Sequence, residues 1–288
     1  MIAIRSPDRH SEPCVVTHDL QNQGICSDDF IERLLSRTSE EKIRSKTAVQ
    51  DHAGRFSTAP INKIEAIRLF NSRNTSVWIA LHSIEHDAEL HDVFVQMARA
   101  IEASLTKPLN KILYCTGAML MSSGKATTPY HMDFGSNLLL QIRGHKNFHA
   151  YSPTDRHIVT EEMLEEFFYT RNSFPASMKY SKEFEKTATI VDLEPGVGIY
   201  MPSTSPHLTT TEEENDVSIS ISLSFVNPAA QCLRRASIMN HKYPQLASAL
   251  PDGVKNAVMY AYEKLHVLRD PEYRPIHETF IPRSRLNN

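Results

Sequence analysis

The stretch TTPYHMDFGSNLLLQIRGHKNFHAYSP (127–153) decides the fold class of this chain and carries its first candidate chemistry. It contains His131-Met132-Asp133, followed closely by the apolar run NLLLQIR (137–143). In an extended backbone, residues i and i+2 point to the same face, so His131 and Asp133 can meet one ion just before a strand. The motif therefore predicts two metal ligands at the end of a sheet.

A third ligand is expected from His207, which follows GIYMPSTSP (198–206) at the far end of a later strand-like run. Two imidazoles and one carboxylate form the facial triad that suits Fe(II), because three positions of the octahedral ion then stay open for a cosubstrate and O₂. An isolated HxD triplet arises easily by chance, so this interpretation depends on its structural context.

Short strand-like runs surround the motif, and turn signals such as Arg143-Gly144 and Glu194-Pro195-Gly196 separate them. The runs are VWIAL (77–81), KILYCTGAML (111–120), NLLLQIR (137–143), KNFHAYS (146–152), ATIVDL (188–193), GIYMPS (198–203) and VSISISLSF (217–225). Many short strands at this spacing favour an antiparallel sandwich or barrel. The last run alternates apolar residues with four serines, which predicts one apolar and one polar face.

Helical patterns flank these strands, so the expected fold class is mainly β with flanking helices (α+β). The helical patterns follow Ser27 and Asp87, cover 161–168, and return at 229–240 and 252–268. We expect three parts: residues 1–75 as a polar, partly helical segment or flap, residues 76–226 as the catalytic β domain, and residues 227–288 as a helical C-terminal region. Apolar surface on the last helix predicts a homodimer through the C-terminal helices.

Composition and cysteine usage argue against several classes of protein. The chain has 288 residues, 41% hydrophobic and 23% charged, with a formal net charge of −3, which argues against nucleic acid as a partner. No stretch approaches the ~20 apolar residues of a membrane span, and the first twenty residues do not make a signal peptide. The four cysteines are scattered without a CxxC pair, which favours a reducing cytoplasm.

Beyond these patterns, the sequence resembles the JmjC and cupin-like 2-oxoglutarate oxygenases, including their protein-asparaginyl hydroxylase branch. The matching features are TPYHMD (128–133), Asn137 six residues after the first histidine, the run NLLLQIRGHKNFHAYSP (137–153) with its Gly-x-Lys step at 144–146, and LEPGVGIYMPSTSPH (193–207). The resemblance covers residues 114–226 and implies a double-stranded β-helix (cupin, jelly-roll) core.

The resemblance also implies roles for single residues. His131, Asp133 and His207 would be the iron ligands and the catalytic centre. The other implied contacts are to 2-oxoglutarate: Lys146 and Thr128 at its C5 carboxylate, Asn137 near its metal-chelating end, and Ser222 as a further small polar contact. Two aromatic residues, Tyr114 and Trp78, could line the pocket. The sequence alone also allows other roles for these residues. Lys146 could be a solvated strand lysine and Ser222 a solvent-facing serine, and the two aromatic residues could be core side chains.

The implied activity is that of an Fe(II)- and 2-oxoglutarate-dependent dioxygenase, which uses O₂, releases succinate and CO₂, and hydroxylates an unactivated C–H bond. Asp133 stands where the histone-demethylase branch has Glu, which disfavours a chromatin role. The substrate expected is an amino acid, a peptide or a related metabolite, with a protein side chain as the alternative. Rival readings are a metal-dependent cupin isomerase or ligand-binding protein that does not use 2-oxoglutarate, and an interaction protein that works through its C-terminal helices.

Overall fold

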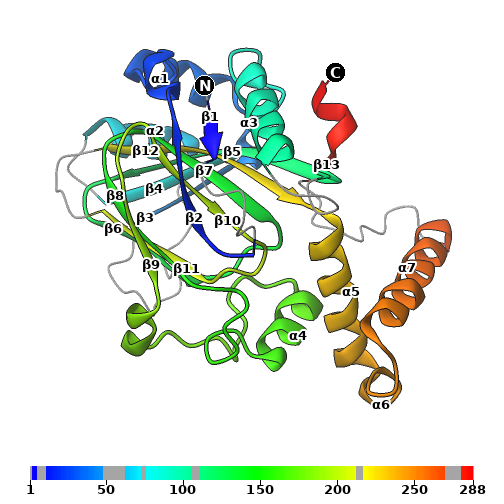
Figure 1. The fold of residues 1–288 in the computed structure, drawn as a ribbon. Helices are drawn as coiled ribbons and strands as arrows, with labels where there is room; N and C mark the ends of the chain where they lie inside the picture. Colours follow the sequence, from blue (N-terminus) through cyan, green and yellow to red (C-terminus); the bar gives the residue numbers. More distant parts are fainter. Residues whose placement is uncertain are drawn as a thin grey trace.

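Two antiparallel sheets face each other and form the core of the protein (Figure 1). The computed structural model describes residues 2–4, 11–47, 62–72, 76–104, 111–211, 217–269 and 280–287. In this part of the chain, the larger sheet has the order β1-β2-β10-β7-β12-β5-β4-β3, with β13 also paired to β5, and the smaller has the order β6-β11-β8-β9. This arrangement confirms the predicted jelly-roll core with flanking helices.

The strands of the larger sheet range from two to ten residues and come from the whole length of the chain. They are β1 (Ile2–Ile4), β2 (Cys14–His18), β3 (Ile43–Thr47), β4 (Val77–His82), β5 (Tyr114–Ser123), β7 (Ser136–Arg143), β10 (Val197–Met201), β12 (Val217–Val226) and β13 (Ile281–Pro282). The smaller sheet contains β6 (Ala126–His131), β8 (Lys146–Ala150), β9 (Thr189–Leu193) and β11 (His207–Thr211). The strands β1, β2 and β3 belong to the segment 1–75, so residues from both sides of the expected boundary share one sheet.

Helices pack against the outer faces of the sheets, and the C-terminal helices form a group that extends away from the barrel (Figure 1). The helices are α1 (Asp28–Arg37), α2 (Lys63–Ser72), α3 (His91–Ser104), α4 (Glu161–Thr170), α5 (Pro228–Lys242), α6 (Pro244–Ala247) and α7 (Asp252–Arg269). The prediction for α1 is confirmed, because the Ser27 hydroxyl accepts a hydrogen bond from the Phe30 amide at 3.2 Å. The helix expected after Asp87 begins at His91.

The apolar core has three layers. One cluster joins α1 and α3 to the outer face of the larger sheet and includes Phe94, Ile221 and Leu223. A second lies between the two sheets, and a third places α4 against the outer face of the smaller sheet. None of the described helices is long and apolar enough to cross a membrane. Residues 1, 5–10, 48–61 and 73–75 of the expected N-terminal segment lie outside the described part of the chain.

The serine face of β12 points into the barrel and not toward solvent. Ser218, Ser220 and Ser222 are buried, at 1%, 0% and 2% exposure. Their apolar neighbours on β12 pack under the outer helices, so the serines face the smaller sheet. The reading of Ser222 as a solvent-facing serine is therefore wrong, because the barrel interior is the polar side of this strand.

Candidate metal centre

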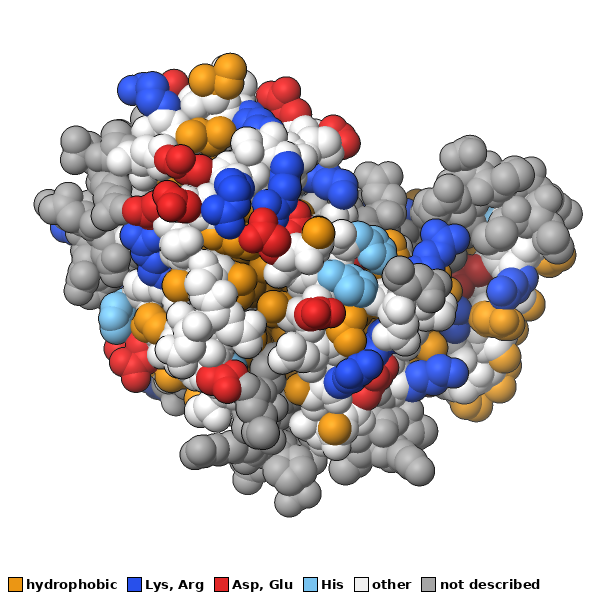
Figure 2. Space-filling model, turned by 90° about the horizontal axis from the view of Figure 1, so that it is seen from above, with side chains coloured by type: hydrophobic (Ala, Val, Ile, Leu, Met, Phe, Trp, Pro, Cys, Tyr) orange, Lys and Arg blue, Asp and Glu red, His pale blue; other side chains and the backbone are white. Residues whose placement is uncertain are grey.

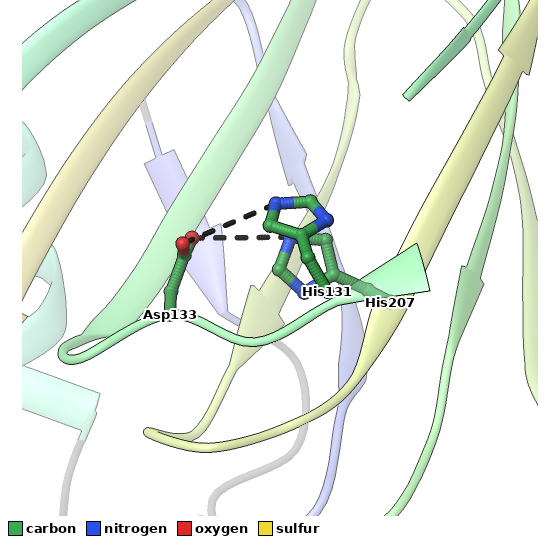
Figure 3. A group of neighbouring side chains, drawn as sticks. All are labelled: His131, Asp133 and His207. Carbon is green, nitrogen blue, oxygen red and sulfur yellow. Dashed lines mark ion pairs between the residues drawn. The ribbon is translucent and has the colours of Figure 1, made fainter. Parts of the chain in front are cut away.

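His131, Asp133 and His207 converge at one end of the barrel (Figure 3). His131 is the last residue of β6 and His207 is the first residue of β11, and the two stand opposite each other in the sheet. Asp133 lies in the turn after β6. One ligand atom from each residue lies within 4.8 Å of the others, so a single ion could contact all three.

The HxD pair lies just before a strand, as predicted, because β7 begins at Ser136. The sequence pattern did not predict the two strands that hold the histidines: β6 ends at His131, and β11 starts at His207. Asp133 meets the imidazoles because the turn folds back, and its carbonyl accepts a hydrogen bond from the Thr204 amide at 3.2 Å.

Both imidazole rings are oriented by hydrogen bonds to the backbone. His131 Nδ1 lies 2.8 Å from the Pro129 carbonyl, and His207 Nδ1 lies 3.0 Å from the Ser205 carbonyl. A carbonyl can only accept, so Nδ1 carries the proton and Nε2 keeps its lone pair. The Nε2 atoms lie 4.0 Å (His131) and 3.8 Å (His207) from the two oxygens of Asp133. This is the tautomer that metal binding requires.

The electrostatics favour a neutral His207. Burial and the neighbouring His131 lower the pKa of His207 to about 4, although Asp133 acts in the opposite direction. A neutral imidazole can bind a cation without first releasing a proton at neutral pH. The Asp133 side chain is 36% exposed, which places the group at an opening of the barrel and not in its centre.

Aromatic side chains hold the outer faces of both imidazoles. The Phe148 ring stacks on His207, with centroids 5.4 Å apart and planes at 12°, and the Phe174 ring stacks on His131 at 5.5 Å and 21°. The two imidazole centroids are 4.1 Å apart. Phe174 was not among the residues picked from the sequence. It lies 43 positions after His131, and no motif marks it.

Lys146 is the first residue of β8 and lies inside the protein, at 7% exposure. It shares a strand face with Phe148, two residues on, and Phe148 contacts His207. Burial lowers the pKa of Lys146 to about 8. Among the described residues, no side chain or carbonyl makes a hydrogen bond or ion pair with its ammonium group. The reading of Lys146 as a solvated strand lysine is therefore wrong.

The other residues expected at the site lie on the same inner surface. Thr128 stands opposite Thr209, which stands opposite Phe148. The Ser222 hydroxyl donates to Asn137 Oδ1 at 2.6 Å. Tyr114, the first residue of β5, is half-buried and stands opposite Val226.

Gln141 is a polar group of the barrel interior that sequence reasoning missed. The side chain is fully buried, accepts from the Ser220 hydroxyl at 2.5 Å, and donates to Ser218 Oγ at 2.9 Å. Its amide also donates to the carbonyls of Arg143 and Gly144, in the turn just before Lys146. Trp78, half-buried on β4, stands opposite Ser122, which itself stands opposite Ser218. Trp78 therefore lies near the end of the barrel that contains Gln141, whereas Tyr114 lies at the other end of β5.

The turn that carries Asp133 passes very close to the backbone of β12 at Gly135, where only a residue without a Cβ fits. A Cβ at this position would lie 2.7 Å from the Phe225 carbonyl oxygen, which is backbone and cannot rotate away. We expect Gly135→Ala to lower the free energy of unfolding by about 1–3 kcal/mol and to weaken metal binding, because the turn must shift. Urea denaturation and metal titration measure both effects.

The matched control for this variant is Gly253→Ala. A Cβ at Gly253 would have no atom within 4 Å. Because Gly253 lies in the first turn of α7, its replacement should be neutral or slightly stabilising. Equal stabilities of the two variants would contradict the steric argument for Gly135.

The fold and the site define a cupin-type barrel with a His/Asp/His group at one end. The family model described as "Cupin-like domain" matches residues 9–229, and the chain belongs to this family. The predicted resemblance is confirmed at this level.

Solved structures that match the chain include two at low sequence identity. The structure of E. coli ycfD matches 100% of this chain at 15% identity and a TM-score of 0.48. DMSP lyase DddQ from Ruegeria pomeroyi DSS-3 matches 39% of this chain at 12% identity and a TM-score of 0.24. The chain spans 66% of the length of the first and 38% of the second. No curated protein matches the sequence significantly.

Proposed function

We propose that this protein is an Fe(II)- and 2-oxoglutarate-dependent dioxygenase. The observation that carries the proposal is the buried Lys146 ammonium, which has no partner among the described residues and lies on the same strand face as Phe148, beside His207. A buried cation without a counter-charge is costly, so the site is built to receive an anion. A cupin isomerase or ligand-binding protein that does not use 2-oxoglutarate has no need for such a group.

The donor set fits the metal. His131 and His207 offer two neutral nitrogen donors and Asp133 one carboxylate, all within 4.8 Å of one another. This set suits non-heme Fe(II) and leaves open positions. When bound, Fe(II) with 2-oxoglutarate and O₂ supplies the oxidising power for hydroxylation of a C–H bond and releases succinate and CO₂.

The protein's own residues would bind and orient the reactants. Lys146 and the Thr128 hydroxyl would bind the C5 carboxylate, where charge-assisted hydrogen bonds are strongest. Asn137, whose oxygen already accepts from Ser222, would offer its amide nitrogen to the other end of the molecule. The apolar layer between the sheets, which includes Phe148, would exclude water from this space.

The substrate proposed is an amino acid, a peptide or a related metabolite, with a protein side chain as the second candidate of the same class. The exposed part of Asp133 places the reacting centre at an opening that such molecules can reach. A formal net charge of −3 argues against nucleic acid. The four cysteines are all free, which supports a reducing compartment such as the cytoplasm.

The deciding experiment is anaerobic addition of Fe(II) and 2-oxoglutarate to metal-free protein. We expect a weak visible charge-transfer band near ~500 nm that requires both components, because the chelated cosubstrate occupies two open positions of the triad. Succinate release in air would then support a substrate screen. Stoichiometric metal binding without the band would reject the proposed class and favour a cupin isomerase or binding protein.

We further propose that α7 mediates a homodimer. An apolar stripe on α7 faces outward: Val254, Val258 and Leu265 are 43%, 45% and 55% exposed. The opposite face packs on α5 through Met259 and through Glu263, which forms ion pairs with Arg234 and Arg235. In Figure 2, orange side chains lie along the outer edge of the right-hand lobe, which contains the C-terminal helices. A helical apolar stripe without a partner supports a second copy of the chain as its cover.

Replacing Val258 with Glu should convert a dimer into a monomer, because a charge would be buried at the centre of the stripe. Sedimentation velocity measures the result. The control is Ile64→Glu, since Ile64 is an apolar residue of α2 that is 80% exposed and lies outside the stripe. A wild-type protein that sediments as a monomer at high concentration would contradict the proposal.

A further inference from the structure

The segment 171–187, between α4 and β9, runs past the metal ligands on the outer side of the smaller sheet. Its Ser173 carbonyl accepts a hydrogen bond from the Met132 amide at 3.2 Å, and Met132 lies between the ligands His131 and Asp133. The next residue, Phe174, stacks on the His131 ring at 5.5 Å with planes at 21°. The segment therefore contacts the metal centre through both its backbone and one aromatic ring.

A carboxylate of α4 holds the segment just after Phe174. Glu166 accepts hydrogen bonds from the Ala176 amide at 2.6 Å, the Ser177 amide at 2.9 Å and the Ser177 hydroxyl at 2.6 Å. The hydrogen bonds from Ser177 and Ala176 hold the pKa of Glu166 below its usual value. This cluster fixes the backbone two and three residues beyond Phe174.

A second carboxylate holds the far end of the segment. Glu185 accepts from Tyr151 Oη at 2.6 Å and Tyr180 Oη at 2.8 Å, and it lies 2.6 Å from His149 Nδ1. Burial opposes ionisation of Glu185, yet these hydrogen bonds keep the pKa of its carboxyl group below the usual value. His149 belongs to β8, the strand that carries Lys146 and Phe148.

Aromatic packing supplements the second anchor. The Tyr130 ring lies 5.6 Å from Tyr180 and 6.3 Å from Phe184, both in the segment. Tyr130 is the neighbour of His131 in β6 and faces the opposite side of the sheet, in the cluster beneath α4. The segment is thus attached to the strand that ends in a metal ligand.

We propose that Phe174 is a positioning residue for the metal ligand His131, held in place by Glu166 and Glu185. The inference rests on the proposed metal centre. Among the described residues, the His131 ring makes one hydrogen bond, from Nδ1 to the Pro129 carbonyl, which holds one edge of the ring. The Phe174 ring, stacked at 5.5 Å, and the His207 ring, 4.1 Å away, pack against it and restrict its remaining torsional motion before the ion binds. A ligand ordered in advance binds metal more tightly, because its conformational entropy is lost on folding and not on binding.

The test is a Co(II) titration of the whole protein, followed by the visible absorption of the bound ion. We expect Phe174→Ala to weaken Co(II) binding about 10-fold, the lower end of what loss of an outer-shell contact causes, and to alter the absorption band. Phe174→Tyr keeps the ring and should restore both. Far-UV circular dichroism checks that each variant is folded.

The role of the anchor is tested by Glu185→Gln, with Glu183→Gln as the matched control. Glu183 is an exposed carboxylate two residues away, in the same short helix, so the change in charge is the same. We expect Glu185→Gln to weaken Co(II) binding and Glu183→Gln to leave it unchanged. Because Glu185 acts through Phe174, the double variant with Phe174→Ala should bind no more weakly than Phe174→Ala alone.

Each outcome decides a separate question. Wild-type affinity and an unchanged band in folded Phe174→Ala would overturn the positioning role and leave the metal centre standing. Additive effects of the two substitutions would overturn the link between Glu185 and Phe174. A wild-type protein that binds no Co(II) would overturn the proposed metal centre and this inference with it.

Discussion

Asp133→Ala is expected to abolish tight Fe(II) binding, with at least ~100-fold lower affinity, since loss of outer-shell contacts alone lowers metal affinity by 10–100-fold. Asp133 supplies the only carboxylate among the three converging residues, and its oxygens lie 4.0 and 3.8 Å from the two imidazole Nε2 atoms. Without it, two neutral nitrogens remain, which bind a divalent ion weakly. Metal titration of the apoprotein, and the visible band with 2-oxoglutarate, measure the effect.

The control for this variant is Asp192→Ala. Asp192 is an exposed residue of β9, on the edge strand of the same sheet. The two variants change the net charge equally, so only a local effect at the site separates them. An Asp133→Ala protein that binds Fe(II) like the Asp192→Ala protein would remove Asp133 from the site.

Lys146→Met should remove the binding of 2-oxoglutarate while leaving the metal in place. Methionine fills a similar volume, so the barrel should keep its packing. Losing one partner of a buried charge pair lowers binding free energy by about 2–5 kcal/mol. The metal-free variant should also unfold at a higher temperature than the wild type, because the wild type carries a buried charge without a described partner.

The measurement is thermal unfolding with and without 2-oxoglutarate, at constant metal concentration. The wild type should show a rise in melting temperature on addition of 2-oxoglutarate, and Lys146→Met should show none. Lys182→Met, an exposed lysine in the short helix after Ser181, is the control for loss of a positive charge. Equal responses of wild type and Lys146→Met would contradict the assigned role of Lys146.

The same lysine predicts a pH dependence of cosubstrate binding. Burial lowers the pKa of Lys146 to about 8, so the free protein keeps the ammonium group below pH 8 and loses it above. A carboxylate binds the ammonium form, so affinity should be constant below pH 8 and fall by about tenfold per pH unit above it. Titrations from pH 6.5 to pH 9.5, a range set by this pKa, test the direction.

The sequence pattern was sufficient to predict the fold class and the helices and strands that have a clear hydrophobic periodicity. The Ser27 cap and the apolar face of α1, the runs of β7, β8 and β12, and helices α5 and α7 appear where periodicity predicts them. Each of these signals is local. A helix or strand of this kind is specified by residues that are neighbours in the chain, so reading along the chain is enough.

The strands that carry the ligands were missed for a physical reason. The sequence of β6, ATTPYH, contains Pro129, and that of β11, HLTTT, has no apolar alternation. Neither has a strand signal of its own, because they form through pairing with each other and with β8. The register that places His207 opposite His131 joins residues 76 positions apart.

Only the tertiary structure decided which face of strand β12 and which face of helix α7 is buried. Alternation in β12 predicts two faces, but it does not say that the serine face lines a polar barrel interior. The stripe in α7 predicts an apolar face, but α5 instead receives the face with Met259 and Glu263. The sequence alone determined the family and most elements, and it named the three candidate metal ligands, because these depend on local pattern and motif. Only the tertiary structure decided which faces are inside, why Lys146 is buried among the strands, and which ring packs on His131, because these depend on contacts between distant parts of the chain.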